Sequence, residues 1–166
     1  MVTPFQDNGA IDFPALDALV DRVTAGGADY LVALGTTAET PTLSTAERKA
    51  VLARIRNRNA GRLPLVAGIG GNDTAGVVAA LRDFDLEGVS AVLSVTPFYN
   101  RPSQRGLYEH FRAVAQAAPV PVILYNVPGR TGVNMLPQTT LQLAGEFDNI
   151  IAVKEASGDM AQIEEL

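Results

Sequence analysis

The stretch that decides the fold is Asn149-Ile150-Ile151-Ala152-Val153-Lys154-Glu155-Ala156-Ser157, in which four apolar residues run without interruption into one lysine. A short apolar run of this kind predicts a strand that is buried on both faces, as in parallel sheets. In folds of alternating strands and helices, active sites are built at the carboxyl ends of the strands. Partial burial there favours the neutral amine of a lysine, which can attack a carbonyl and form a Schiff base. Lys154 is therefore the first candidate catalytic residue, and the alternative is that it pairs with a carboxylate at the sheet rim.

Apolar strands and amphipathic helices alternate along the chain with a period of roughly 30 residues, the size of a βα unit. The expected strands are 30–34, 63–68, 91–95, 121–125 and 149–154, and a stub of one more is expected before Thr3. No GxGxxG motif opens a helix after a strand, which counts against a dinucleotide-binding sheet. A TIM barrel needs about 250 residues. The sequence therefore predicts one α/β domain, 1–166, that is a partial TIM (β/α)8 barrel of about six βα units.

Local signals predict where the helices between these strands begin. Helix starts are expected at Asp12, at Ser44 with a capping box to Glu47, at Asp73 or Thr74, at Ser103 and at Asp159. The only histidine, His110, is expected on a solvated helix face and is assigned no role.

Composition excludes several classes of protein. Hydrophobic residues make up 47% of the chain, which indicates a globular protein. The net charge is −5 and no basic block is present, which argues against nucleic acid as a partner. No apolar run approaches the roughly 20 residues of a membrane span and no secretory leader is visible, so a cytoplasmic enzyme is expected. The absence of cysteine excludes cysteine-ligated metals, and a single histidine disfavours a histidine metal site.

Polar side chains gather where successive strands end. Thr36 and Thr37 follow the strand at 30–34, Tyr99 follows the strand at 91–95, and Tyr125 closes the next strand before that of Lys154. Phenols can shuttle the protons that carbinolamine formation and dehydration require. Each residue alone has a structural explanation, because strand-end tyrosines are often half-buried core residues. Their joint placement at one rim predicts an acid/base relay around a Schiff base.

Two further groups of this candidate site could bind the carboxylates of acidic substrates. The backbone amides and hydroxyls at Thr36 and Thr37 could hold a small carboxylate. Arg130, which follows the strand of Tyr125, offers a planar fork for a second carboxylate. The sequence therefore predicts a site that can hold two carboxylates.

Four motifs, taken together and in order, resemble the dihydrodipicolinate synthase family of pyruvate-Schiff-base lyases and synthases. They are Gly35-Thr36-Thr37-x-Glu39, the run from Thr96 to Gln104, the run from Tyr125 to Gly132, and Ile151-Ala152-Val153-Lys154-Glu155. The resemblance implies condensation of pyruvate with aspartate 4-semialdehyde in lysine and diaminopimelate biosynthesis, with no cofactor beyond the covalent imine. It also implies a homodimer or homotetramer, two further strands and a C-terminal helical domain absent from this chain.

The resemblance assigns a role to each candidate residue. Lys154 would form the imine with pyruvate, and Tyr125 would transfer protons to the intermediate. Thr36 would link Tyr125 to Tyr99, which would reach in from a neighbouring subunit.

The carboxylates have their own partners in this scheme. Thr37 would bind the pyruvate carboxylate, and Arg130 would bind the carboxylate of the semialdehyde.

The sequence departs from the family pattern in two respects. Ala38 replaces a glycine, and its Cβ would strain a turn that needs positive φ. The chain is also short, so the 166 residues alone are expected to have little synthase activity. Two alternatives stay open: an N-acetylneuraminate or 2-keto-3-deoxy-sugar-acid lyase, which would typically carry serine at Thr36 and lack Arg130, and a fragment without catalytic function.

Feedback by lysine is expected to be weak or absent. The resemblance implies that lysine-inhibited members of the family bind lysine through four side chains, namely an asparagine, a glutamate, a histidine or a second glutamate, and a tyrosine. Here Asn72 keeps the asparagine, whereas Gly76, Arg48 and Phe98 stand at the other three positions. The ammonium group of the ligand would therefore lose its carboxylate and meet an added positive charge.

Overall fold

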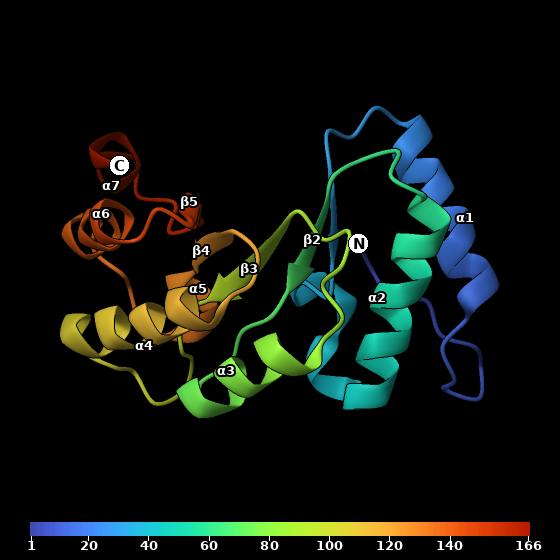
Figure 1. The fold of residues 1–166 in the computed structure, drawn as a ribbon, viewed down its shortest axis with the longest axis horizontal. Coiled ribbons are helices and arrows are strands. Elements are labelled where there is room, and N and C mark those ends of the chain that lie inside the picture. Colours follow the sequence, from blue (N-terminus) through green and yellow to red (C-terminus); the bar gives the residue numbers. More distant parts are fainter. The chain divides into compact units, whose positions relative to one another are not determined.

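The computed structural model describes all 166 residues of the chain (Figure 1). They divide into two compact parts. The first part comprises Met1–Gly68 and Phe84–Ala91, and the second part comprises Ile69–Asp83 and Val92–Leu166. Each part contains parallel strands and its own buried side chains.

Strands and helices alternate along the chain, as the period of the sequence predicted. The strands are β1 (Leu31–Ala33), β2 (Leu65–Gly68), β3 (Ala91–Val95), β4 (Val122–Asn126) and β5 (Ile150–Glu155). The α-helices are α1 (Phe13–Ala25), α2 (Thr45–Asn59), α3 (Thr74–Asp83), α4 (Gln104–Ala117), α5 (Pro128–Thr131), α6 (Pro137–Glu146) and α7 (Met160–Glu165). Two 3₁₀ helices, η1 (Thr36–Ala38) and η2 (Thr40–Thr42), follow β1. No helix combines the length and the apolar character that a membrane span requires.

The first part contains the parallel pair β1 and β2, with Leu31 opposite Leu65. Both side chains are buried. A Cβ atom at Gly68 would lie only 2.1 Å from the carbonyl oxygen of Leu34, so the close approach of the two strand ends requires glycine.

The N-terminal segment lies against β1, where a further strand stub was expected. The amino group of Met1 donates to the carbonyl oxygen of Val32 at 2.8 Å, and the hydroxyl of buried Thr3 donates to the carbonyl of Ala38 at 2.8 Å. The segment forms no regular strand.

Helices α1 and α2 pack side by side in the first part (Figure 1). The buried side chains of α1 are Leu16 and Val20, and α2 contributes Val51, Leu52 and Ile55. Their helical spacing produces an apolar stripe on each helix.

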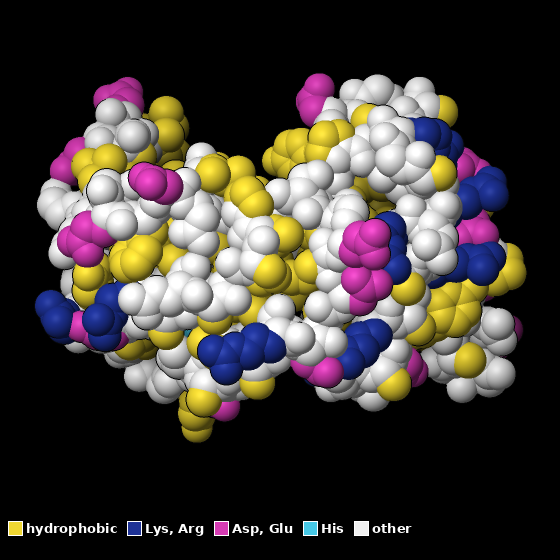
Figure 2. Space-filling model, in the orientation of Figure 1, with side chains coloured by type: hydrophobic (Ala, Val, Ile, Leu, Met, Phe, Trp, Pro, Cys, Tyr) yellow, Lys and Arg dark blue, Asp and Glu magenta, His cyan; other side chains and the backbone are white.

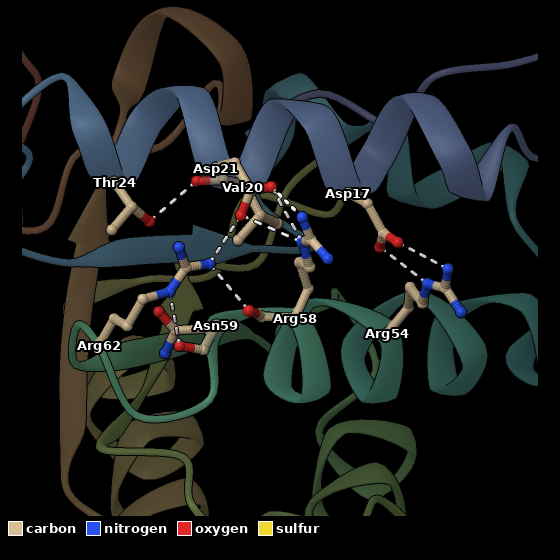
Figure 3. A network of polar contacts seen from close by, with 8 residues as sticks. All are labelled: Asp17, Val20, Asp21, Thr24, Arg54, Arg58, Asn59 and Arg62. Carbon is tan, nitrogen blue, oxygen red and sulfur yellow. Dashed lines mark hydrogen bonds and ion pairs between the residues drawn. The ribbon is translucent and has the colours of Figure 1, made fainter.

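Opposite charges join the outer surfaces of α1 and α2, where acidic and basic side chains are interspersed (Figure 2). Arg54 donates Nε and Nη2 to the two carboxylate oxygens of Asp17 at 2.7 and 2.6 Å, and Asp21 accepts from both Arg58 and Arg62 (Figure 3). These hydrogen bonds hold the pKa of both aspartates below its usual range. Because the pairs are exposed to solvent, they orient the helices more than they stabilise the fold.

The second part is built on β4, which pairs in parallel with β3 on one side and β5 on the other. Helix α4 contacts both α3 and α6. Its side chains Leu107, Phe111 and Val114 are fully buried, as is Leu124 of β4. These residues form the core on one face of the three strands.

The predicted helix starts are confirmed by their caps. Helices begin after N-cap side chains at Asp12, Ser44, Ser103 and Asp159. Ser44 and Glu47 form the complete capping box. At α3 the cap is Asp73 and not Thr74, because Asp73 accepts from the amide of Ala75 at 3.1 Å.

The expectation that His110 is solvated is wrong. The residue is 3% exposed, and its Nδ1 lies 2.8 Å from Oγ1 of Thr74 on α3. His110 falls three residues after Leu107 and four before Val114, so the helical period places it in the buried stripe of α4. Burial lowers the pKa of the imidazole to about 4.

The expected strain at Ala38 is also absent. Ala38 is buried within η1 and has no positive φ, whereas Leu34 and Glu39 on either side have φ of 56° and 55°. The left-handed conformations therefore fall on Leu34 and Glu39, and the methyl group of Ala38 is buried without backbone strain.

The strand of Lys154 is not buried on both faces. Ile150 is buried, but Ile151 is 57% exposed and Lys154 is exposed too. The physical reason is that β5 pairs with β4 along one edge only, and one of its faces has no covering layer in these 166 residues.

Candidate functional site

Tyr125 and Lys154 lie side by side at the carboxyl ends of β4 and β5. They are directly opposite in the register of the two strands, and the Lys154 Nζ atom lies 4.3 Å from the centroid of the Tyr125 ring. Tyr125 is buried, whereas Lys154 is exposed. An ammonium group at this distance is attracted by the ring face, so the pair holds the amine beside an aromatic wall. The structure thus brings together two residues that the sequence proposed as partners.

A second pair, Asn126 and Glu155, lies on the other face of the same two strands. Nδ2 of Asn126 donates to the two Glu155 carboxylate oxygens at 3.1 and 2.9 Å. Nε2 of Gln162 donates to the same carboxylate at 3.0 Å, and the amide of Ser157 donates at 2.8 Å. Partial burial alone would raise the pKa of Glu155, but these hydrogen bonds outweigh it and lower the pKa.

This second pair was missed in the sequence. The signal was present, because Tyr125-Asn126 and Lys154-Glu155 are two neighbouring dipeptides in which alternate residues point to opposite faces. The candidate site residues take one face, and a hydrogen-bonded pair takes the other.

Tyr99 lies in a strained loop after β3. It has a φ of 73°, Arg101 has a φ of 46°, and such backbone conformations cost about 1–3 kcal/mol each in residues other than glycine. The Tyr99 ring is 89% exposed, and its amide donates to the carbonyl oxygen of Thr131 at 3.4 Å. Within this chain the phenol therefore points into solvent, and the loop that carries it is tied to the loop after β4.

Arg130 lies in the short helix α5, directly before Thr131. Its side chain is exposed, and the turn is closed by the hydroxyl of Thr131, which donates to the carbonyl oxygens of Val127 and Val133 at 3.2 and 3.0 Å. The guanidinium is therefore presented to solvent from a fixed turn and is available to a carboxylate.

Thr36 and Thr37 belong to the first part of the chain. Both are exposed in η1 directly after β1, and the turn is fastened by the hydroxyl of Thr40, which donates to the carbonyl oxygen of Leu34 at 3.0 Å. Their link to Tyr125 stays a prediction. No group of three or more acidic or histidine side chains is arranged to hold a metal ion.

Residues 1–166 match the sequence profile described as the dihydrodipicolinate synthetase family. This chain belongs to that family. It is 52% identical over 166 residues to the 4-hydroxy-tetrahydrodipicolinate synthase of Parabacteroides distasonis, and the match covers 100% of this chain and 56% of that protein. The chain thus spans little more than half the length of this curated relative of the dihydrodipicolinate synthetase family.

Solved structures of the family agree with the fold. The chloride-inhibited dihydrodipicolinate synthase of Acinetobacter baumannii, complexed with pyruvate, matches with a TM-score of 0.93 at 41% identity, over 98% of this chain and 55% of that one. A monomeric dihydrodipicolinate synthase variant matches with a TM-score of 0.95 at 37% identity, over 99% and 55%. The prediction of a parallel α/β fold that corresponds to part of a TIM barrel is confirmed. That residues 1–166 form one domain stays a prediction.

Proposed function

We propose that the protein to which this chain belongs condenses pyruvate with aspartate 4-semialdehyde through a Schiff base at Lys154, as a step of lysine and diaminopimelate biosynthesis. The observation that carries the proposal is the amine of Lys154 held 4.3 Å from the ring centroid of Tyr125 at the ends of two parallel strands. Membership of the dihydrodipicolinate synthetase family and the pyruvate complex of the Acinetobacter relative support the choice of substrate. The relative from Parabacteroides, named as a synthase, favours this reaction over that of a sugar-acid lyase.

The chemistry follows from the two side chains. The neutral amine of Lys154 attacks the keto carbon of pyruvate, and the resulting carbinolamine loses water to give the imine. Tyr125 supplies and accepts the protons of these steps as a general acid and base. The imine makes the pyruvate methyl group acidic, Tyr125 accepts a proton from that methyl group, and the enamine so formed attacks the aldehyde carbon of the second substrate. Covalent chemistry at Lys154 needs no cofactor.

The remaining candidate residues bind or relay in this proposal. Thr37 holds the pyruvate carboxylate, Arg130 holds the carboxylate of the semialdehyde, and Thr36 passes protons between Tyr125 and Tyr99. The exposure of Tyr99 fits a phenol that enters the site of another subunit of a homodimer or homotetramer. Because a monomeric variant exists in the family, sedimentation of the longer protein is the direct measurement of its oligomeric state. A cytoplasmic location is part of the same proposal.

Borohydride reduction in the presence of pyruvate tests the proposed imine. Residues 1–166 contain two lysines, Lys49 and Lys154, and peptide mass spectrometry distinguishes an adduct at Lys154 from one at Lys49 or elsewhere in a longer protein. We expect one reduced pyruvate adduct, at Lys154, in a longer protein that carries this sequence, and little turnover or labelling in the 166-residue chain alone. Lys154→Arg is the matched control because it keeps the charge but cannot form the imine. An adduct at Lys49, or at the amino terminus only, would contradict the proposed function.

Lysine should bind the longer protein weakly or not at all. Gly76 offers no carboxylate to the ammonium group of the ligand, and Arg48 adds a positive charge that repels it. Leaving the ammonium of the ligand without its partner costs several kcal/mol. Titration calorimetry with lysine should therefore show no saturable heat in the sub-millimolar range. Tight binding that also slows the reaction would show that other residues form the regulatory site.

A further inference from the structure

Strand β5 contains one residue more than its partner strand needs. Val122 of β4 lies opposite Ile150, but the next residue, Ile123, lies opposite Ala152. Ile151 therefore has no partner in the register, and the pairing shifts there by one residue. This irregularity is a β-bulge, a feature that re-aims the side chains that follow it.

The bulge decides which face Lys154 takes. Side chains alternate between faces along a strand, so a shift of one residue moves every later side chain to the opposite face. If the same sequence paired regularly onward from Val122 and Ile150, without the bulge, Val153 would lie opposite Tyr125, and Lys154 would lie opposite Asn126. The amine would then point into the hydrogen-bonded face and away from the Tyr125 ring.

Exposure along β5 agrees with this assignment. On the face of Asn126, Ile150 is 6% exposed, and Val153 and Glu155 are half-buried. On the face of Tyr125, Ala152 and Lys154 are exposed. The two faces of β5 are thus distinct, and the bulge separates the buried start of the strand from its functional end.

The shifted register is secured at its far end by Asn126 and Glu155. Asn126 donates to both carboxylate oxygens of Glu155, and its own Oδ1 accepts the amide of Met135 at 3.0 Å. The backbone carbonyl of Asn126 also accepts the amide of Ala156 at 2.8 Å. Any slip of β5 along β4 would break these bonds in a buried place, since the Asn126 side chain is fully buried.

We infer that Asn126 and Glu155 are positioning residues, whose hydrogen bonds hold β5 in the shifted register that places the amine of Lys154 over the ring of Tyr125. The inference rests on the proposed function, in which that amine forms the imine. Neither residue touches the reacting atoms in this arrangement. They act through the register of β4 and β5, and their loss misplaces the lysine by more than the ~1 Å that can cost about 100-fold in rate.

The ring of Tyr125 provides a direct readout of this position. In the chain with ¹³C-labelled lysine, the ε-methylene signal of Lys154 should be displaced by the ring current, and the signal of Lys49 serves as the internal reference. Tyr125→Leu should abolish the displacement and so assigns it. We expect Glu155→Ala to reduce it, and Glu155→Gln to retain more of it, because glutamine keeps the length and one acceptor oxygen. Deletion of Ile151 should retain the displacement, because β5 without its unpaired residue pairs regularly with Lys154 still opposite Tyr125.

The matched control is Glu165→Ala, which removes another carboxylate of the second part that accepts a hydrogen bond, here from Gln138 at 2.6 Å. It should leave the Lys154 signal unchanged. Retention of the full displacement in folded Glu155→Ala would overturn the inference. If Glu155→Ala does not fold, the Ile151 deletion decides, because loss of the displacement in that folded variant would show that the position of Lys154 does not follow the register of β4 and β5.

Imine trapping separates this inference from the proposed function. If Lys154 shows the ring-current displacement and Glu155→Ala reduces it, the positioning is correct even where borohydride traps no pyruvate. If pyruvate is trapped at Lys154 equally fast in the wild type and in Glu155→Ala, the function stands and the positioning role is wrong. In the longer protein we expect trapping in Glu155→Ala to slow by about 10–100-fold over the whole pH profile.

Discussion

Replacement of Lys154 by alanine should abolish condensation of pyruvate with the semialdehyde in a longer protein that carries this sequence. We expect the rate to fall by roughly 10⁴-fold or more, the loss that follows removal of a covalent nucleophile. The physical reason is that the imine converts pyruvate into a carbon nucleophile, and Lys154 supplies the amine that lies over the Tyr125 ring. Steady-state assay of the purified variant measures the effect.

Lys154→Arg separates charge from nucleophilicity in this experiment. A guanidinium keeps the positive charge over the ring but stays protonated and cannot attack a carbonyl. It should be as inactive as the alanine variant, with a similar KM for any residual turnover. Activity within tenfold of the wild type in either variant would place the imine elsewhere.

The free energy of unfolding of the chain should fall as the pH is lowered from about 6.5 to about 4, because of His110. The folded-state pKa of this buried imidazole is about 4, below the value of about 6.5 in an unfolded chain. Above the unfolded value both states are neutral and His110 has no effect. Between the two values only the unfolded chain binds the proton, so stability declines, by up to about 3 kcal/mol, and levels off below about 4.

His110→Asn isolates this contribution, because asparagine does not titrate and keeps a polar atom for Thr74. Urea unfolding near pH 7 and near pH 4.5 should show a smaller loss of stability in the variant than in the wild type, at an unchanged m value. Thr74→Val is the control, since it removes the hydroxyl at 2.8 Å but keeps the buried imidazole and therefore the slope. Equal slopes in wild type and His110→Asn would mean that the imidazole is solvated in solution.

Much of the local architecture could be predicted from neighbouring residues alone. The capping box of Ser44 and Glu47, the cap at Asp12 and the strand that contains Lys154 each depend on side chains within a few positions of one another. Hydrophobic period and cap chemistry act at that range, so the sequence indicates them directly. The choice of Lys154 and Tyr125 as partners rested on a rule of the fold, that parallel strands bring their carboxyl ends to one edge.

The tertiary structure decided what depends on segments distant in the chain. Whether Lys154 faces Tyr125 or Asn126 is set by the register of β5 against β4, and the bulge at Ile151 that sets it exists only when the two strands pair. The bond between Asn126 and Glu155 joins residues 29 positions apart.

The burial of His110 has the same origin. The sequence shows that His110 falls in line with the apolar residues of its helix. A single polar residue at such a position can either lie at the edge of the solvent-exposed face or be buried against another helix. Contact with Thr74 of α3, 36 residues away, resolves this. Local propensity acts within about one helical turn, so the sequence alone determined where the helices and strands of this protein form. Strand register and side-chain burial come from contacts between whole helices and strands, so the fold determined which face each of them presents.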